Sequence, residues 1–427
     1  MKKVWLIIPA MCCILLAGCL STSSTTQTLD SSTESVVQET TQTTQTQETE
    51  TQTTQTKWLV TIKPWSGPIY SSSNLFSSRD LEQEAYLDDA TYITVESNQD
   101  VTITEEGVYV LQWEAENLTI YVEASTDDKV QLVLNNLSIS NTDFPCIYIK
   151  SADKTFITTA KGSENYLEVT EWFVDDWETN TNGAIFSKDD ITLNGLWTLT
   201  INSTKNGIVW KDDLKITWGT YIITAAKKAI DANDSIRISD WNFTLNAWTD
   251  ALHAENNDDD TIGFIYIGWW TFNLSVGDDA LHATSIVQID DWTLDITASE
   301  WIEATYVQIN GWSITIAATD DWINASSKSD TYEVAIEITW WDLTITMWAG
   351  DTDWIDSNGN LYLYGWTINI SARSPADYDG TVIYSWATLI IDGVTYDYVP
   401  NQMMWGRWGW NNAMFSNENF QWRGWRR

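Results

Sequence analysis

The sequence predicts an all-β protein, a parallel β-helix whose short turns of chain stack along one axis. Three observations predict it: a motif recurs about every 22 residues, short runs of alternating apolar residues precede each copy, and no stretch keeps a helical period. The repeat is clearest where Asp279-Ala280-Leu281-His282-Ala283 returns as Glu300-Trp301-Ile302-Glu303-Ala304, and again as Asp321-Trp322-Ile323-Asn324-Ala325.

The apolar residue at the centre of the motif marks each turn. Neighbouring turns of a β-helix lie roughly 4.8 Å apart, so equivalent residues stack and together bury a core that no single turn could bury alone. Two long steps contain polar inserts, residues 255–260 and 326–330, which we expect to form loops at one corner. The expected inner column is Ile185, Ile208, Ile230, Leu252, Leu281, Ile302, Ile323, Ile355 and Tyr378.

Two alternating runs precede each central residue, and this alternation is typical of strands. We therefore expect three strands of three to five residues and tight corners in every turn. A β-propeller is the rival architecture, but its blades need about 40 residues or more. Examples of the paired runs are Val287-x-Ile289 with Leu294-x-Ile296, Val307-x-Ile309 with Ile314-x-Ile316, and Leu361-x-Leu363 with Ile368-x-Ile370.

The ends of the chain have a different composition. Residues 1–18 read as a secretory signal, with a basic start and an apolar stretch from Val4 to Leu16 that is too short for a comfortable membrane span. Leu16-Ala17-Gly18-Cys19 resembles a bacterial lipobox, which predicts lipidation at Cys19 and an exported protein anchored to the outer face of the cell membrane. The alternative is an ordinary secreted protein.

The predicted domains follow from these ends. Residues 19–57 are rich in Ser, Thr and Gln and predict a disordered stalk, because such a segment cannot bury enough apolar surface to fold. Residues 58–400 form the β-helix and residues 401–427 a flexible tail rich in Gly, Trp and Arg.

Charge and cysteine content narrow the possible partners. The formal net charge of -38, with only 22 Lys plus Arg, excludes nucleic acid and favours divalent cations. The lipid chain is then the only contact with the membrane that we expect. Cys12 and Cys13 leave with the signal and Cys19 carries lipid, so Cys146 lacks a partner and disulfides do not hold the fold. We expect a monomer.

Tryptophan occupies positions that suit glycine. The chain has 28 Trp and only 20 Gly, and one corner slot holds Trp in nine successive turns although tight corners favour Gly. We hypothesise that many of these residues are glycine in the living protein, encoded by UGA codons. If they are genuine, they form an aromatic ribbon suited to stacking on sugar rings. The corner residues are Trp197, Trp218, Trp241, Trp270, Trp292, Trp312, Trp341, Trp366 and Trp386.

A second slot, directly before the inner column, shows the same exchange. It holds Gly207, Ala229, Ala251 and Ala280 in four turns, and Trp301, Trp322 and Trp354 in three others.

Several motifs resemble one known family. Asp250-Ala251-Leu252-His253-Ala254, its copy at residues 279–283, residues 187–193 and residues 376–380 look like the repeats of a bacterial β-helix family of carbohydrate-binding domains. The resemblance covers roughly residues 91–399, with Trp standing where that family has Gly. It implies a right-handed parallel β-helix of pectate-lyase-like shape, usually a lipoprotein. It also implies calcium and a polysaccharide partner of cellulose or acidic pectic type.

An acidic row two residues before the inner column indicates a cation site. Carboxylates stacked at this spacing repel by roughly 3.5 kcal/mol at an effective dielectric near 20, and Ca²⁺ would relieve the repulsion with its preference for oxygen ligands. The alternative is that these acids are merely hydrated. The candidate ligands are Asp250, Asp279, Asp278, Glu300, Asp320, Asp321 and Asp353, with further oxygens at Asp351, Asn324 and Asp356.

Two other groups in these rows allow different chemistry. His253 and His282 share one slot in adjacent turns, as a transition-metal site would require. Lys228 interrupts the acidic row and is the best candidate for a base that removes a ring proton in a polysaccharide lyase. The sequence thus favours a surface-anchored, non-catalytic polysaccharide-binding protein. A calcium-dependent lyase of pectate type and a passive surface adhesin or spacer are the alternatives.

Overall fold

A computed structural model describes residues 59–176, 179–290, 293–311, 313–318, 322–346, 354–371 and 376–401. All of them belong to one compact unit, residues 56–427. The signal, the stalk and the tail, including Cys19, lie outside the described residues, apart from Asn401 at the start of the tail. Within the described part, no helix has both the length and the apolar character to cross a membrane.

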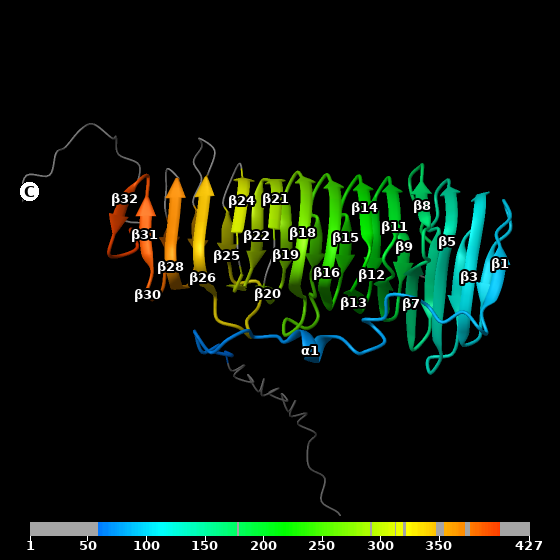
Figure 1. Cartoon of the computed structure of the whole chain (residues 1–427), viewed down its shortest axis with the longest axis horizontal. Helices are drawn as coiled ribbons and strands as arrows, with labels where there is room; N and C mark the ends of the chain where they lie inside the picture. The colour runs from blue at the N-terminus through cyan, green and yellow to red at the C-terminus, as the bar shows by residue number, and fades with distance from the viewer. Residues whose placement is uncertain are drawn as a thin grey trace, which may run out of the picture. The chain divides into compact units, whose positions relative to one another are not determined.

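The described strands form two sheets that run the length of the molecule and face each other across the core (Figure 1). The first has twelve parallel strands, one from each turn of the chain. They are β2 (Val101–Ile103), β4 (Ile120–Glu123), β6 (Ile147–Ser151), β9 (Gly183–Ser187), β12 (Asn206–Trp210), β15 (Ile230–Ala232), β17 (Leu252–Ala254), β19 (Asp279–Ala283), β22 (Glu300–Ala304), β25 (Ile323–Ala325), β27 (Ile355–Ser357) and β29 (Asp377–Tyr378).

The second sheet has twenty strands and wraps around the remaining two sides of each turn. They are β1 (Thr91–Thr94), β3 (Gly107–Glu116), β5 (Lys129–Asn141), β7 (Lys154–Thr159), β8 (Glu164–Val169), β10 (Ile191–Asn194), β11 (Thr198–Ser203), β13 (Asp213–Ile216), β14 (Thr220–Ala225), β16 (Ser235–Ala247), β18 (Phe264–Val276), β20 (Ile286–Ile289), β21 (Thr293–Ala298), β23 (Tyr306–Ile309), β24 (Ser313–Ala318), β26 (Ala335–Thr346), β28 (Asn360–Ser371), β30 (Val382–Ser385), β31 (Thr388–Ile391) and β32 (Val394–Tyr396). The last two pair antiparallel.

The predicted inner column exists, which confirms the parallel β-helix. Leu252 pairs with Leu281, which pairs in turn with Ile302 and then Ile323, and all four side chains are buried. The column extends from Val101 on β2 to Ile355 on β27 through successive parallel pairings. The hydrophobic effect along this one file of side chains holds the turns together.

The assignment of Tyr378 to this column was wrong. Tyr378 pairs with Ser357, so the residue level with Ile355 is the buried Ala376. The bulkier Tyr378 side chain is partly exposed and packs against the core from outside this column.

The corner between the two alternating runs of a turn also differs from expectation. In β16, β18, β26 and β28 the chain bends without leaving the strand, so two predicted strands form one strand of 12 or 13 residues. Backbone pairing continues through the bend, for example from Trp241 to Trp270.

The two predicted polar inserts do form loops, and they contact each other. The carboxylate of Asp260 in the first loop accepts a hydrogen bond from the backbone N–H of Asp330 in the second at 2.7 Å, and another from the hydroxyl of the adjacent Thr331 at 3.0 Å. The inserts therefore share one corner of the β-helix, as the sequence predicts.

A segment that the repeat does not explain lies along the second sheet. We call residues 59–81 the strap; it includes the short helix α1 (Ser72–Leu75) and runs beside the sheet along the long axis (Figure 1). Its backbone bonds to an outward column of the sheet. The Trp65 N–H donates to Glu337 at 2.7 Å, and the Tyr70 N–H donates to Gln288 at 2.6 Å.

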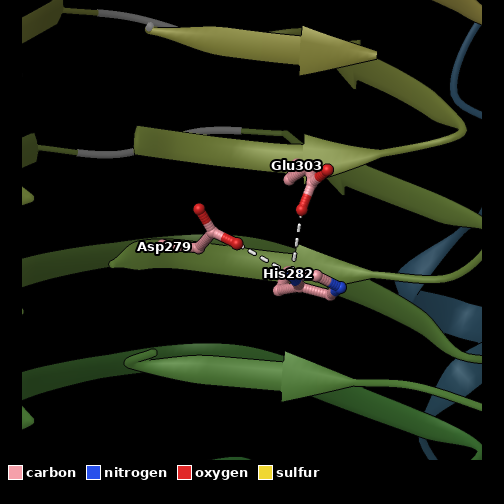
Figure 2. Close-up of side chains that lie close together, drawn as sticks. All are labelled: Asp279, His282 and Glu303. Atoms are coloured by element: carbon pink, nitrogen blue, oxygen red, sulfur yellow. Dashed lines mark hydrogen bonds and ion pairs between the residues drawn. The ribbon is translucent and has the colours of Figure 1, made fainter. Parts of the chain in front are cut away.

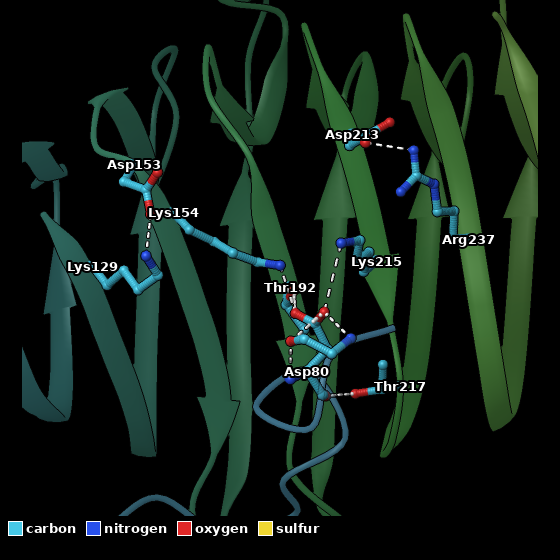
Figure 3. Close-up of polar contacts among 10 residues, drawn as sticks. Asp80, Lys129, Asp153, Lys154, Thr192, Asp213, Lys215, Thr217 and Arg237 are labelled. Atoms are coloured by element: carbon cyan, nitrogen blue, oxygen red, sulfur yellow. Dashed lines mark hydrogen bonds and ion pairs between the residues drawn. The ribbon is translucent and has the colours of Figure 1, made fainter. Parts of the chain in front are cut away.

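The strap ends in a buried ion cluster (Figure 3). The carboxylate of Asp80 is fully buried, with the ammonium groups of Lys154 at 2.5 Å and Lys215 at 3.5 Å, and it accepts a hydrogen bond from the Thr192 hydroxyl at 2.8 Å. Burial alone would raise the pKa of Asp80, but the hydrogen bond and charge of Lys154 outweigh it and hold that pKa well below its usual range.

Cys146 is a buried thiol in the core. Burial raises its pKa to about 12, so it remains protonated and packs as a small apolar side chain.

Candidate functional site

A strip of charged side chains lies on the outer face of the twelve-stranded sheet. It arises because two successive residues, Ala280 and Leu281 in β19, are both buried in the core. The residues on either side, Asp279 and His282, consequently both point outward and meet. The same local bend brings two outward rows together in neighbouring turns. We call this the charged strip: Lys228, Asp231, Asp250, His253, Asp279, His282, Glu300 and Glu303.

The centre of the charged strip is a group of three possible metal ligands (Figure 2). His282 Nδ1 lies 2.7 Å from Asp279 Oδ2 and 3.2 Å from Glu303 Oε2. One ligand atom from each residue lies within 4.8 Å of the other two. Two carboxylates and an imidazole at this spacing can bind one divalent cation, or the histidine can carry the compensating charge itself.

The rest of the charged strip alternates acids and bases. Asp231 Oδ1 contacts Lys228 Nζ at 3.1 Å and His253 Nδ1 at 2.9 Å. The His253 ring stacks on His282, with centroids 4.7 Å apart. Each end of the histidine pair is thereby joined to an acid, and charge compensation extends over three successive turns.

At Asp231 burial is outweighed by the hydrogen bond of His253 and the charge of Lys228, which lower the pKa, whereas burial makes Asp279 and Asp250 easier to protonate. Burial raises the pKa of Asp279, and the charges of Glu303 and Asp250 add to that effect while His282 opposes it. Burial also raises the pKa of Asp250, with Asp278 adding to the effect while His253 and Lys228 oppose it. A divalent cation would remove both penalties, because it favours the charged form of its ligands.

The predicted ligands are spread over the charged strip and its surroundings. Asp279 pairs with Glu300 in register, and Asp250 precedes them by one turn. Glu300 accepts a hydrogen bond from the Asn324 amide at 3.4 Å, whereas Asp278 is exposed. Asp320, Asp321 and Asp353 lie outside the described residues. The group of three therefore joins one predicted ligand, Asp279, to Glu303 and His282, which belong to the neighbouring outward row.

A second acidic cluster was missed by the sequence reasoning. Burial, together with the charges of Asp190, Asp234 and Asp213, raises the pKa of Asp212 to about 6. These acids occur at the start of successive turns, in Asp189-Asp190, Asp212-Asp213 and Asp234. Their regular spacing was the signal that could have revealed them.

The fold and the charged strip together define a class: a β-helical repeat protein that presents rows of side chains on a flat outer face. Residues 97–385 match the family described as "Carbohydrate-binding domain-containing protein". The chain belongs to that family, as its motifs indicate, and a carbohydrate is the partner that this membership implies.

Two known proteins are similar to parts of this chain. A "Carbohydrate-binding domain-containing protein" from Acetivibrio thermocellus is 38% identical over 132 residues, which are 30% of this chain and 46% of the relative. This chain thus spans about half the length of that relative. The solved structure of a polysaccharide lyase-like protein from C. thermocellum is 28% identical, with a TM-score of 0.48, and covers 52% of this chain and 96% of its own.

Proposed function

We propose that the protein is a non-catalytic, monomeric polysaccharide-binding protein that holds a divalent cation in the charged strip. The observation that carries this proposal is the group of Asp279, His282 and Glu303 on the outer side of the twelve-stranded sheet, in a chain of a carbohydrate-binding family. The bound ion would neutralise the carboxylates and leave coordination positions free for the oxygens of an acidic sugar.

Calcium is the first candidate for this ion. Ca²⁺ binds six to eight oxygens, and the strip offers carboxylates from Asp279, Glu303 and Asp250, so water or sugar oxygens would supply the remaining ligands. A specific observation favours a second candidate. His282 Nδ1 lies between the two carboxylates, and an imidazole ligand suits Zn²⁺ and other transition metals better than Ca²⁺.

Thermal unfolding of the protein with added ions tests both candidates. We expect Ca²⁺ to raise Tm by an amount that corresponds to about 2.7 kcal/mol at a hundredfold excess over Kd, and Asp279→Asn to abolish the rise. Asp127→Asn, an exposed acid on a distant turn, is the matched control. A Tm rise with Zn²⁺ alone that disappears in His282→Gln identifies the transition-metal site. If neither ion changes Tm, the cation proposal fails.

The non-catalytic assignment is supported by the surroundings of Lys228. Its ammonium group is engaged with Asp231 at 3.1 Å and therefore does not present a free amine to a ring proton. Incubation with polygalacturonate and Ca²⁺ separates the candidates. Retention without new absorbance from unsaturated products indicates a binder, rising absorbance indicates a lyase, and no retention on any glycan indicates a passive adhesin or spacer.

We further propose that the protein is exported and anchored by lipid on Cys19. The basic start, the apolar stretch and the lipobox-like residues before Cys19 support this proposal. Metabolic labelling with a palmitate analogue should mark the wild-type protein, and Cys19→Ser should release an unlabelled protein into the medium. Equal labelling of both proteins would contradict the assignment.

Backbone angles support the proposal that many tryptophans are glycine in the living protein. Among the described non-glycine residues with positive φ, four are Asn or Asp, which tolerate this region, and the others are Trp65, Trp113 and Trp386 with φ of 63°, 86° and 64°. A bulky aromatic residue has no local reason to adopt such angles, whereas glycine adopts them freely. The coding sequence provides the test, since UGG codons at these positions would refute the proposal.

A further inference from the structure

A pocket at the N-terminal end of the twelve-stranded sheet combines aromatic rings with carboxylates. The pocket has a volume of about 250 Å³. Leu118, Thr119 and Asn141 line it together with six further residues. These six are Asp100, Asn117, Tyr121, Thr142, Asp143 and Phe144. The volume lies below the roughly 300–1,000 Å³ of pockets for drug-sized ligands, so it suits a single small ring.

One wall of the pocket is aromatic. The rings of Tyr121 and Phe144 lie 6.4 Å apart, and both contact the buried Tyr148 at 5.9 and 6.1 Å. Tyr121 and Phe144 remain partly exposed and both line the pocket, and the Lys150 ammonium lies 4.6 Å from the centroid of the Tyr121 ring. Such rings pack against the C–H faces of a sugar and bury area at little cost in side-chain entropy.

The other wall offers hydrogen-bond acceptors. The Asp143 carboxylate makes no hydrogen bond or ion pair with any residue that the structure describes. Asp100 accepts one bond, from the Thr119 N–H at 2.8 Å, which fixes its orientation. Asn117 and Thr142 are linked to each other at 2.8 Å on the rim. Two carboxylates facing one ring can accept bonds from its hydroxyl groups, and these bonds are strengthened by charge.

Backbone hydrogen bonds hold this pocket in shape before any ligand arrives. The carbonyl of Thr142 accepts from the Glu171 N–H at 2.7 Å, and that of Asp143 accepts from the Val174 N–H at 2.9 Å. The Asn141 side chain bonds to the Leu118 N–H at 2.9 Å and to the Phe144 carbonyl at 3.2 Å. A ligand therefore meets a pre-organised site, which lowers the entropic cost of binding.

The pocket belongs to the same outward row as the charged strip. Tyr121 pairs with Tyr148, and the row continues through Phe186 and Val209 to Asp231. Tyr148, Phe186 and Val209 are fully buried, so the row is covered between the pocket and the charged strip, and the two sites are separate surfaces of one sheet. The pocket contains no tryptophan, so it does not depend on how the tryptophan codons are decoded.

We propose that this pocket is a subsite for a neutral pyranose unit of the polysaccharide, a proposal that rests on the polysaccharide-binding function above. The two carboxylates, Asp100 and Asp143, favour hydroxyl donors and repel a uronate. Acidic sugars would instead engage the cation of the charged strip. The two sites thus divide the neutral and acidic parts of the partner between them.

Binding titrations of the full chain test the pocket with four probes: cellohexaose, mannohexaose, xylohexaose and hexagalacturonate. We expect wild-type protein to bind at least one neutral hexaose with or without EDTA. Asp143→Asn and Tyr121→Ala should each weaken that binding roughly tenfold or more, because each removes a charge-assisted bond or a ring contact. Binding of hexagalacturonate should change less than twofold in either variant.

Two matched controls accompany these variants. Asp127→Asn removes an exposed carboxylate from a turn outside the pocket, and Tyr92→Ala removes a ring that is 60% exposed on β1. Asp143→Asn changes no buried packing, so it remains informative if Tyr121→Ala destabilises the fold. Neutral binding that both variants retain, or that EDTA abolishes, overturns the pocket proposal. Binding of hexagalacturonate alone overturns the pocket while the general function stands, and no binding of any glycan overturns both.

Discussion

Replacing Trp322 by glycine tests how the core of the C-terminal turns is built. The Trp322 side chain is fully buried between Trp301 and Trp354, with ring centroids 4.8 and 5.8 Å away. Its indole N–H has no hydrogen-bond partner among the described residues. In earlier turns the same slot holds Ala251 and Ala280, which are equally buried, so the core closes there around a methyl group.

The expected magnitude depends on which residue belongs at this slot. If tryptophan is native, its truncation costs about 3–5 kcal/mol, and glycine in a strand adds about 0.5–1. Relief of the unpaired N–H returns about 1–3 kcal/mol. The net loss is then about 3 kcal/mol for Trp322 and larger for the three slots together. If glycine is native, the triple variant with glycine at all three slots restores the natural packing.

We expect the triple variant to be at least as stable as the tryptophan form. The assay is urea unfolding followed by circular dichroism, with Ile302→Ala as the control that should lose about 2–5 kcal/mol in either background. Ile302 is fully buried in the inner column, so its loss creates a cavity whatever occupies the neighbouring slot. A triple variant that fails to fold, or that loses 3 kcal/mol or more, refutes the glycine assignment.

Two further predictions concern buried acids. The pKa of Asp212 is raised from 3.8 to about 6, so its folded form binds a proton more tightly and stability falls as pH rises from about 4 to 7. The loss of stability is up to about 3 kcal/mol, which solvent screening reduces to about 1–2 kcal/mol. Asp212→Asn should flatten the dependence of Tm on pH. An unchanged slope would contradict the assignment. The pKa of Asp80 is lowered, so its contribution is present above about pH 4 and is lost on acidification. Asp80→Ala should cost about 3–5 kcal/mol and expose the strap to limited proteolysis, which an intact strap in the variant would contradict.

The sequence predicts what repetition enforces. The inner column was predictable because a β-helix aligns equivalent residues, and Leu281, Ile302 and Ile323 recur at a constant spacing of 21 residues. The prediction failed at Tyr378 because it chose the largest apolar residue of that turn. The structure places the small Ala376 in the column instead. The long bent strands were not predicted. A bend that keeps its backbone pairing needs no turn residue, so the sequence carries no signal for it.

The candidate site was only partly predictable for a related reason. Alternation places Asp279 and His282 on opposite faces of a regular strand, yet they lie 2.7 Å apart because Ala280 and Leu281 both turn inward. That irregularity depends on packing against the other sheet. The strap was also missed, since residues 59–81 share no pattern with the turns, and Gln288 and Glu337 look like ordinary solvent-facing residues until the strap covers them.

The strap has a consequence for the order in which the molecule assembles. Val60 bonds to Thr331, and Asp80 bonds to Lys154, so one short stretch of early chain spans turns that are synthesised much later. A solenoid without such a segment can add turns one after another as the chain emerges. Here the earliest part of the folded unit must wait for the latest turns before it can dock. In a chain truncated before Thr331, Val60 and Trp65 would lose their partners, whereas Asp80 would still reach Lys154 and Lys215.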